Sequence, residues 1–384
     1  MIAVRAVFWA SVFLVVVTYV LYPAVMGLLA RRRRHDPPPA ALTALPRVTI
    51  LIAAHDEAEV IGRRLENLAA LDYPTHLVDI LVLSDGSTDG TVAEARAHAP
   101  ANARVIESIE RRGKSAILDR ALGEIQGEIV VFTDANSAFE TDALRHLVAP
   151  FADPGVGCVV GELTYANTEN PRVGRGEGLY WRYENVLKRW ESQLGSTIVA
   201  NGSIYATRRD LIRPVAHHVD FDSMLPLQVL VAGYRVLFEP RARAREKAAE
   251  SLGEELGRKV RIIVQQISGL VVVPGVLSPA RPRVALMLLC HKVLRWAVPL
   301  LLVANLAAAT ALGAAPSARV AVSLHAVVAA AAAIGWLLDR LGLPAGWLWV
   351  ATYFWGVNLA SVAALLSFLL GRRIRHWEKA PSTR

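Results

Sequence analysis

An uncharged run of 25 residues near the start of the chain, 6–30, constrains the fold more than any other feature, and four arginines follow it directly at 31–34. The apolar stretch of a secretory signal is only about 7–15 residues long, whereas a helix of about 20 apolar residues crosses a bilayer. We therefore predict a retained transmembrane anchor over 1–30. Because arginine and lysine concentrate on the cytoplasmic side of a span, the arginines place the following chain in the cytoplasm.

From residue 47 the sequence alternates short β-branched runs with polar turns and segments of helical periodicity. A basic, proline-rich linker, 31–46, separates this part from the anchor. The predicted strands are 48–54, 78–85, 103–108 and 128–136. Strands that alternate with helices form a mostly parallel sheet, whose ligands bind beyond the carboxyl ends of the strands. We predict a cytoplasmic α/β domain over 47–265.

Beyond residue 265 the composition becomes apolar again. Segment 260–277 is interrupted by glycine and proline, which favours an interfacial or re-entrant helix. Three longer apolar runs follow at 294–313, 318–338 and 347–370, and they give four spans with the anchor. We predict an interfacial helix and an α-helical transmembrane bundle over 266–371, and a basic tail over 372–384.

The side of the membrane on which the tail lies has two interpretations. Three spans after a cytoplasmic domain leave the tail outside, whereas Arg372, Arg373 and Arg375 favour the cytoplasm. A further crossing within 260–292 would reconcile the two. We favour a cytoplasmic tail.

The basic excess of the chain is small and lies beside the apolar segments. Lys and Arg number 42 against 34 Asp and Glu, a net charge of +8, and 53% of the residues are hydrophobic. This composition excludes a disordered or solvated repeat protein, and the position of the basic runs beside spans explains them without nucleic acid. Cys158 and Cys290 form no CxxC or Cys/His cluster, so neither a disulfide framework nor a structural zinc site is expected.

An acidic motif, SDGSTD (84–89), ends the second predicted strand. Asp85 is followed by glycine and hydroxyl residues, and a helix is predicted to begin at Ser87 or Thr88. A carboxylate here suits hydrogen bonds from a base or ribose while the backbone approaches closely. The alternative is an N-capped turn, since the same residue types favour turns.

A second acidic motif, TDAN (133–136), ends the fourth predicted strand. Side chains two residues apart in extended chain point the same way, so the oxygens of Asp134 and Asn136 can share a divalent cation. A carboxylate for the nucleotide and a cation-binding pair in one parallel sheet are what a nucleotide-sugar site requires.

Six motifs occur together in one order. They are AAHDE (53–57), SDGSTD (84–89), RRGK (111–114), TDAN (133–136), ANGSIYATRR (200–209) and the eleven-residue step from Asp222 to GYR (233–235). With this set the chain resembles the membrane-bound family 2 glycosyltransferases, the group that contains cellulose, chitin, hyaluronan and poly-N-acetylglucosamine synthases. The resemblance covers 47–265 and the flanking membrane segments. It implies a GT-A-like nucleotide-sugar domain, inverting sugar transfer and a Mg²⁺ or Mn²⁺ cofactor.

The resemblance implies that AAHDE contacts the donor nucleotide through Ala54, Asp56 and Glu57. The chain departs from the family here, because His55 and Asp56 replace the more usual small residue and asparagine.

Three further residues match donor-side positions of the family. Asp85 matches the carboxylate that holds the uracil or ribose, although Ser84 replaces the preceding acid, and Lys114 matches a lysine near the donor. Asp134 matches the first acid of the metal motif, whereas Asn136 replaces the second acid and offers an oxygen without a full charge.

The family resemblance also implies a catalytic base. In its members an acidic pair lies eleven residues before a Gly-Tyr turn, and eleven residues before Gly233 is Asp222. Phe221 fills the place of the accompanying acid, and Asp220 lies one residue further back. The alternative for Asp222 is a plain N-cap, since 223–231 has a helical pattern.

Acceptor and diphosphate contacts are predicted in two places. Asn201 and Gly202 match the acceptor-site loop, and Trp181 lies in a helical segment whose aromatics either stack on sugar or fill a core.

Processive synthases of the group carry a Gln-x-x-Arg-Trp motif, and the matching place here reads RKVRI. Arg258 and Arg261 in that segment can still bind a diphosphate.

Polar residues also lie within the first C-terminal apolar region. His291, Lys292, Arg295 and Trp296 are expected to face lipid headgroups or a lipid-linked acceptor, or simply to anchor the helix at the interface.

The sequence therefore predicts an integral membrane glycosyltransferase that uses a nucleotide-sugar donor, preferably UDP-linked, and a polysaccharide, lipid-linked or lipid acceptor. Guanine-nucleotide donors stay open, and export partners are unknown. The alternative is a non-catalytic nucleotide-sugar-binding scaffold or a transport component of polysaccharide export. A dinucleotide oxidoreductase is excluded, because no GxGxxG follows the first strand.

Overall fold

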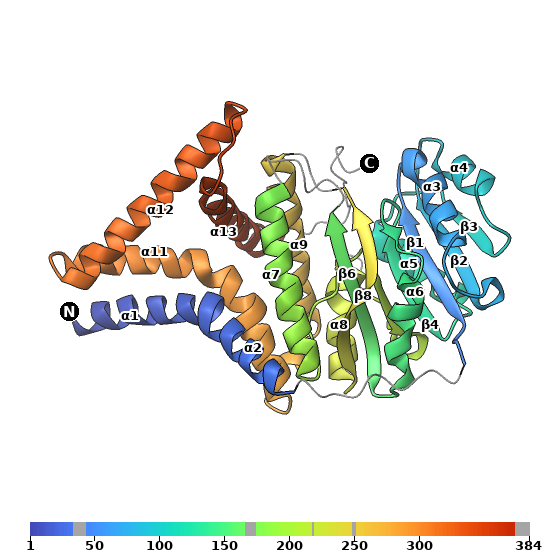
Figure 1. Ribbon diagram of the computed structural model, residues 1–384, viewed down its shortest axis with the longest axis horizontal. Coiled ribbons are helices and arrows are strands. Elements are labelled where there is room, and N and C mark those ends of the chain that lie inside the picture. The colour runs from blue at the N-terminus through green and yellow to red at the C-terminus, as the bar shows by residue number, and fades with distance from the viewer. Residues whose placement is uncertain (34–43, 166–173, 217–218, 248–250, 373–384) are drawn as a thin grey trace.

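The computed structural model describes residues 1–33, 44–165, 174–216, 219–247 and 251–372. Most of the predicted linker and of the basic tail therefore lies outside the described residues. An α/β domain forms one end of the molecule and long apolar helices form the other (Figure 1). Helices α7 (Gly174–Gln193) and α9 (Leu252–Val272) stand between the two parts.

The α/β domain is built on one eight-stranded sheet with the strand order β3-β2-β1-β4-β7-β6-β8-β5. The strands are β1 (Val48–Ala54), β2 (Val78–Asp85), β3 (Ala103–Ser108), β4 (Ile129–Asp134), β5 (Ala138–Phe139), β6 (Val156–Tyr165), β7 (Tyr205–Arg208) and β8 (Arg235–Glu246). β1 pairs in parallel with β2 and β4, β2 with β3, and β6 with β8. β7 and β5 pair antiparallel with their neighbours. The predicted mostly parallel sheet is confirmed.

The four strands predicted from sequence are all present, with one difference in length. The first three have their predicted bounds, whereas the fourth begins at Ile129 instead of 128 and ends at Asp134, and residues 135–136 form a turn. All residues of β1 and β2 are buried, which is the pattern of central parallel strands covered on both faces.

Helices cover both faces of the sheet and enclose two hydrophobic cores. They are α3 (Ala58–Ala69), α4 (Thr91–Ala97), α5 (Lys114–Ala121), α6 (Ala143–Val148) and α8 (Phe221–Val231). Alternate residues of β1 enter opposite cores: Ile50 and Ile52 pack with α3 and α6, and Leu51 and Ala53 pack on the side of α5 and α8. This layering leaves the carboxyl ends of the strands at one edge of the domain.

Four helices of the described residues are long and apolar enough to cross a membrane. They are Ile2–Arg32, formed by α1 (Ile2–Val16), a π-turn (Val17–Leu21) and α2 (Tyr22–Arg32); Pro282–Leu312, formed by α10 (Pro282–Leu288), a π-turn (Leu289–Val293) and α11 (Leu294–Leu312); α12 (Pro316–Arg340); and α13 (Leu348–Leu369). The four predicted spans are present, and their outer faces expose large apolar side chains such as Val303 and Val320, as lipid-facing helices do.

The segment predicted over 260–277 as an interrupted helix is divided in the structure: α9 covers its first part without a break at Gly269, and a 3-10 turn (Pro274–Leu277) follows. α9 begins at Leu252, where the Ser251 hydroxyl accepts a hydrogen bond from the Glu254 amide, and it ends two residues before Pro274. Residue 265 thus lies inside α9. One side of this helix packs against Trp296 of α11 and Ala364 of α13, so α9 belongs to the α/β part and to the apolar part alike.

A buried ion cluster ties α7 to the apolar helices. Its members are Tyr22, Glu184, Glu191, His291, Lys292 and Arg295. The Glu184 carboxylate contacts His291 Nε2 at 2.9 Å, Lys292 Nζ at 3.0 Å and an Arg295 guanidinium nitrogen at 2.7 Å. Glu191 accepts from the Tyr22 hydroxyl at 2.7 Å and contacts His291 Nδ1 at 2.6 Å.

The expectation that the polar residues at 291–296 face lipid headgroups is wrong for most of them. His291 is fully buried, and Arg295 is paired with Glu184. Trp296 packs against α9. The physical reason is that α7 brings the carboxylates of Glu184 and Glu191 into contact with this segment. These residues are about 100 positions away in the sequence, so a local pattern could not predict the contact.

Candidate functional site

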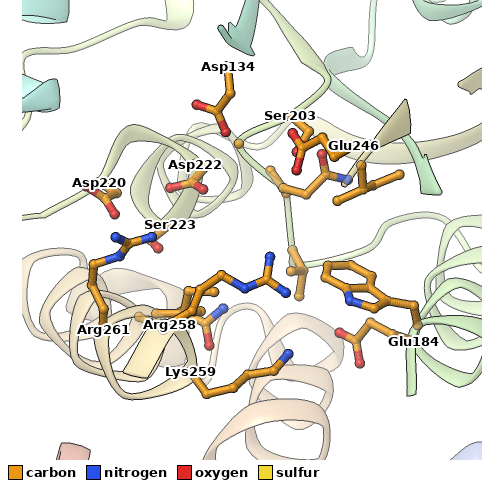
Figure 2. Close-up of a pocket in the computed structure, with 18 of the residues that line it drawn as sticks. Asp134, Glu184, Ser203, Asp220, Asp222, Ser223, Glu246, Arg258, Lys259 and Arg261 are labelled. Atoms are coloured by element: carbon orange, nitrogen blue, oxygen red, sulfur yellow. The ribbon is translucent and has the colours of Figure 1, made fainter. Parts of the chain in front are cut away.

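A cavity of about 520 Å³ lies where the end of β4, the loop before β7 and the start of α8 face α7 and α9. Nine residues predicted from sequence line it: Lys114, Asp134, Asn136, Trp181, Asn201, Gly202, Asp222, Arg258 and Arg261. Figure 2 shows Asp134 and Asp222 at one end and Glu184 and Lys259 at the other, with Arg258 between them. The cavity therefore extends from the sheet to the helices that join the apolar part.

Asp134 and Lys114 form an ion pair at the sheet end of the cavity. Asp134 is the last residue of β4 and Lys114 the first residue of α5, and Nζ lies 2.5 Å from Oδ1. Burial alone would lower the pKa of Lys114, but the carboxylates of Asp134 and Asp222 outweigh it and raise that pKa. Lys114 is therefore a fixed cation within the site.

Gly202 lies at the centre of the acidic end. A Cβ added to it would lie 3.1 Å from Asp222 Oδ2, 3.3 Å from Asp134 Oδ2 and 3.4 Å from Lys114 Nζ. Only hydrogen at this position leaves the space between these three side chains open. Its neighbour Asn201 holds the loop, because its amide donates to the Gly161 carbonyl and accepts from the Ile204 amide. The Asn201 side chain thus has a role in positioning the loop that the sequence prediction lacked.

Asp222 lies in the first turn of α8, and the N-cap of that helix is Asp220. The plain N-cap interpretation of Asp222 is therefore wrong. Phe221 between them is buried and stacks on Phe132 of β4 at 5.6 Å, which fixes the start of α8 beside the sheet. Burial is the largest effect on the pKa of Asp222, and the charge of Asp220 is the second. Together they raise this pKa to about 7, although the charge of Lys114 acts to lower it.

Four residues predicted to contact the donor nucleotide do not line the cavity: Ala54, Asp56, Glu57 and Asp85. Ala54 is fully buried at the end of β1. The two oxygens of the buried Asp85 carboxylate accept the backbone N–H groups of Arg112 and Gly113, both at 2.8 Å. In the structure Asp85 therefore holds the RRGK loop against the end of β2.

Asp56 and Glu57 hold the neighbouring loop in the same way. Asp56 has a positive φ of 51°, and its carboxylate accepts the Thr88 amide at 2.8 Å. The Glu57 amide donates to the Thr91 hydroxyl at 2.7 Å. Because Asp56 holds residues 88–89 in a turn, α4 begins at Thr91 rather than at the predicted Ser87 or Thr88.

Two cationic residues of α9 reach into the cavity from the predicted RKVRI segment. Arg258 donates to the Tyr165 hydroxyl at 3.0 Å and pairs with Glu255. Arg261 lies toward the acidic end, where its charge opposes the rise in the pKa of Asp222. The structure thus brings both predicted diphosphate-binding residues to the same cavity as Asp134 and Asp222.

The aromatic segment predicted to meet the acceptor is part of α7. Trp181 packs edge to face on Tyr165 and Tyr180, at 5.9 and 6.0 Å between ring centroids, and also lines the cavity. Sequence reasoning missed Glu184 and Lys188, which line the cavity with Trp181. Glu184 lies three residues after Trp181 and Lys188 four residues after Glu184, the spacing of one helix face. That spacing was the available signal.

The oxygen atoms at the acidic end fit a divalent cation in part. Asp134 and Asn136 both line the cavity, although Asn136 lies in a turn and not in the extended chain predicted. Among the described residues no group of three or more His, Cys, Asp or Glu side chains is arranged to hold a metal ion. Mg²⁺ and Mn²⁺ sites with few protein ligands are completed by water and substrate phosphate, so a carboxylate and an amide oxygen suit such an ion together with a diphosphate.

Sequence comparisons identify relatives of the α/β part. Residues 49–215 match the model described as Glycosyl transferase family 2. A beta-monoglucosyldiacylglycerol synthase of Nostoc sp. strain PCC 7120 is 33% identical over 215 residues, which are 55% of this chain and 46% of that protein. A poly-beta-1,6-N-acetyl-D-glucosamine synthase of Staphylococcus aureus is 24% identical over 228 residues, 56% of this chain and 53% of that protein. The chain thus spans about half the length of these curated relatives.

One similar solved structure covers nearly the whole chain. It is a mannosyltransferase from Pyrobaculum calidifontis in complex with GDP-Man and Mn²⁺, 25% identical with a TM-score of 0.71, over 96% of this chain and 99% of that one. The similarity includes the apolar helices as well as the sheet.

Proposed function

The chain carries a glycosyl transferase family 2 domain over residues 49–215, and we propose that it is an inverting membrane glycosyltransferase that moves a sugar from a nucleoside-diphosphate sugar to a lipid acceptor. The α/β domain faces the cytoplasm in this proposal, because four arginines follow the N-terminal apolar helix. The donor nucleotide is proposed to be uridine, as expected from the sequence, and guanosine is the competing choice because the similar mannosyltransferase was solved with GDP-Man.

Asp222 is the proposed base. A carboxylate with a pKa of about 7 is ionised in about half of the molecules at neutral pH and still accepts a proton readily. It takes the proton of the acceptor hydroxyl while that oxygen attacks the anomeric carbon. The bond between this carbon and the diphosphate breaks with its electron pair on the leaving nucleotide, and the configuration inverts.

The donor diphosphate is proposed to lie between the acidic end and α9. Lys114, Arg258 and Arg261 supply positive charge there. Asp134 and Asn136 would hold a divalent cation, which neutralises the charge that develops on the leaving diphosphate. Gly202 leaves room for the acceptor hydroxyl beside Asp222.

A second cavity supports a lipid acceptor and is the observation that carries the proposal. This small cavity of about 30 Å³ shares Asp222, Ser223 and Lys292 with the main one. Its other walls are mostly apolar and come in part from the helices of the apolar bundle; they include Ile198, Leu227, Leu270, Leu288 and Trp296. Its volume is close to that of one water molecule, so it holds no lipid tail; its apolar walls instead let the hydroxyl end of a lipid acceptor approach Asp222 from the side of the apolar bundle.

Polymer synthesis is the second candidate, because the Staphylococcus aureus relative is named as a polysaccharide synthase. The segment RKVRI on α9 lacks the glutamine and tryptophan of processive relatives, which favours single transfers. A non-catalytic scaffold is the remaining alternative. It predicts nucleotide binding without turnover.

The test is a donor screen with the purified protein in detergent. UDP-glucose, UDP-N-acetylglucosamine and GDP-mannose, each radiolabelled, are incubated with Mn²⁺ and a bacterial lipid extract. Label in one organic-soluble product supports the proposal. A ladder of long, organic-insoluble products would replace it with polymer synthesis, and absence of label in any product despite nucleotide binding would replace it with the scaffold.

A further inference from the structure

Lys188 is a buried cation that lines the cavity. Its side chain is 1% exposed, and within the described residues it forms neither a hydrogen bond nor an ion pair. Its ammonium instead lies 4.6 Å from the ring centre of Phe238 and 5.7 Å from that of Trp181. Such a group is costly to bury, because cation–π contacts replace only part of the lost hydration.

The nearest carboxylate on the same helix face is already used. Glu184 lies one turn before Lys188; it is paired with the cations Lys292 and Arg295 and also contacts His291. Burial, the largest effect, therefore lowers the pKa of Lys188 to about 8 despite the charge of Glu184. An added negative charge at this place would be stabilised by the ammonium.

A second unpartnered donor lies beside Lys188. The Trp181 indole N–H is buried and has no hydrogen-bond partner among the described residues, and Trp181 lines the same cavity. Trp181 and Lys188 are seven residues apart and so share one face of α7. Both residues line the cavity, and neither the Lys188 ammonium nor the Trp181 indole N–H has a hydrogen-bond acceptor among the described residues.

We propose that Lys188 and Trp181 form an acceptor subsite that binds an anionic group, a phosphate or a carboxylate, on the head of the lipid acceptor. This inference rests on the proposed function, and it excludes a neutral diacylglycerol as the preferred acceptor. The anionic group receives hydrogen bonds from the Lys188 ammonium and the Trp181 indole. The hydroxyl of the same head group then points to Asp222, and the apolar tail stays on the side of the apolar bundle.

Phosphate binding is tested with the donor site blocked. The full chain in detergent is saturated with nucleoside diphosphate and Mn²⁺, and binding of dodecyl phosphate, dodecyl glucoside and inorganic phosphate is measured by calorimetry. Dodecyl phosphate is expected to bind, and Lys188→Met is expected to weaken it by about tenfold or more. Arg189→Met, an exposed cation on the same helix, is the matched control and leaves binding unchanged.

The outcomes separate the possible ligands. Equal binding of inorganic phosphate and dodecyl phosphate would mean a free phosphate site and would overturn the lipid assignment. Equal binding of dodecyl phosphate to the wild type and to Lys188→Met, or its absence from the wild type, would overturn the subsite. A thermal melt reports whether Lys188→Met is folded; if it is not, Trp181→Phe, which removes the indole N–H together with one ring of the side chain, takes its place with the same expected direction.

Acceptor kinetics distinguish failure of this inference from failure of the proposed function. With a productive donor, the wild type is expected to have a lower KM for phosphatidylglycerol than for diacylglycerol, and Lys188→Met is expected to remove that preference. Transfer without the preference would defeat the subsite alone. No transfer to any lipid, with dodecyl phosphate still bound through Lys188, would defeat the proposed function alone.

Discussion

The ammonium of Lys114 lies 2.5 Å from the carboxylate of Asp134, the residue that would hold a divalent cation. A divalent cation at Asp134 would therefore compete with the Lys114 ammonium for that carboxylate. In the function proposed above, Lys114 would turn to the donor diphosphate when the cation takes its place at Asp134. Metal binding and donor binding would then be linked through these two side chains.

Replacement of Lys114 by methionine is expected to change metal binding and donor binding in opposite directions. Without the competing ammonium, Mn²⁺ alone binds more tightly, whereas the KM of the nucleotide-sugar rises by about tenfold because a diphosphate contact is lost. Calorimetric titration of Mn²⁺ and initial-rate kinetics measure these effects. Arg120→Met, an exposed cation on the same helix, is the control. Weaker Mn²⁺ binding in Lys114→Met would contradict the competition.

Removal of metal is expected to abolish transfer while the protein remains folded. Asp134 and Asn136 offer only one full charge, so the cation depends on the diphosphate for its remaining ligands. Dialysis against EDTA followed by Mn²⁺ or Mg²⁺ titration, with and without nucleotide, measures this dependence. Full activity after removal of metal would contradict the role given to Asp134.

Gly202→Ala tests the space in the middle of the site. The new methyl group would lie 3.1 Å from Asp222 Oδ2 and 3.3 Å from Asp134 Oδ2, so we expect kcat to fall by about 100-fold while the protein stays folded. Gly123→Ala, which has no atom within 4 Å of the added Cβ, is the matched control. Equal kcat values for both variants would show that this space is not used by a substrate.

Glu184→Gln tests the buried ion cluster. The change leaves His291 and the two cations Lys292 and Arg295 facing a neutral amide, and breaking a buried network in this way costs about 3–5 kcal/mol. Glu107→Gln breaks an exposed pair with Arg96 and is expected to cost less than about 1 kcal/mol. Thermal unfolding in detergent compares the two. Similar melting temperatures would mean that the cluster does not hold α7 in place.

The pH dependence of transfer follows from the pKa of Asp222. A base must be ionised, so kcat/KM is expected to rise by about tenfold per pH unit in acid and to level off above about pH 7. Since Asp220 interacts with Asp222, the profile reports the pair, and Asp220→Asn is expected to shift the midpoint to lower pH because it removes the neighbouring charge. A profile that is flat from pH 5 to 8 would contradict the assignment.

The contribution of Asp222 to folding stability falls as the pH rises, whereas its contribution to the transfer rate grows. The pKa of Asp222 is about 7 in the folded protein against 3.8 as the ordinary value, so the folded state holds the proton more tightly. This contribution to stability is complete below the ordinary pKa and is lost as the pH rises through 7. Asp222→Asn is therefore expected to melt with a weaker dependence on pH than the wild type between these limits.

Local patterns predicted the fold well. Continuous β-branched runs predicted β1, β2 and β3 with their bounds, because central parallel strands need apolar residues on both faces. The four apolar helices followed from length and hydropathy alone. The start of α4 was missed because Asp56, more than 30 residues earlier, holds the preceding turn, and a window of neighbouring residues cannot contain that contact.

Only part of the site could be predicted, because some of its residues depend on contacts with residues far away in the sequence. Motif spacing located Asp134, Asp222 and Gly202, which the structure places around one cavity. Asp85 was predicted to face the nucleotide, but its carboxylate binds the backbone of the 112–113 loop. Lys188 was missed because two facts set it apart: it is buried, and the neighbouring Glu184 is already paired with residues of a distant helix. The order of residues along α7 reveals neither fact.

The central claim is that Asp222 is the base of a sugar transfer, and the rate constant of Asp222→Asn tests it most directly. The amide keeps the shape of the side chain but cannot take a proton, so kcat is expected to fall by about 100- to 10,000-fold while nucleotide and Mn²⁺ still bind. Asp210→Asn, at an exposed position, is the control and keeps its kcat. A folded Asp222→Asn protein that transfers sugar at the wild-type kcat would contradict the account.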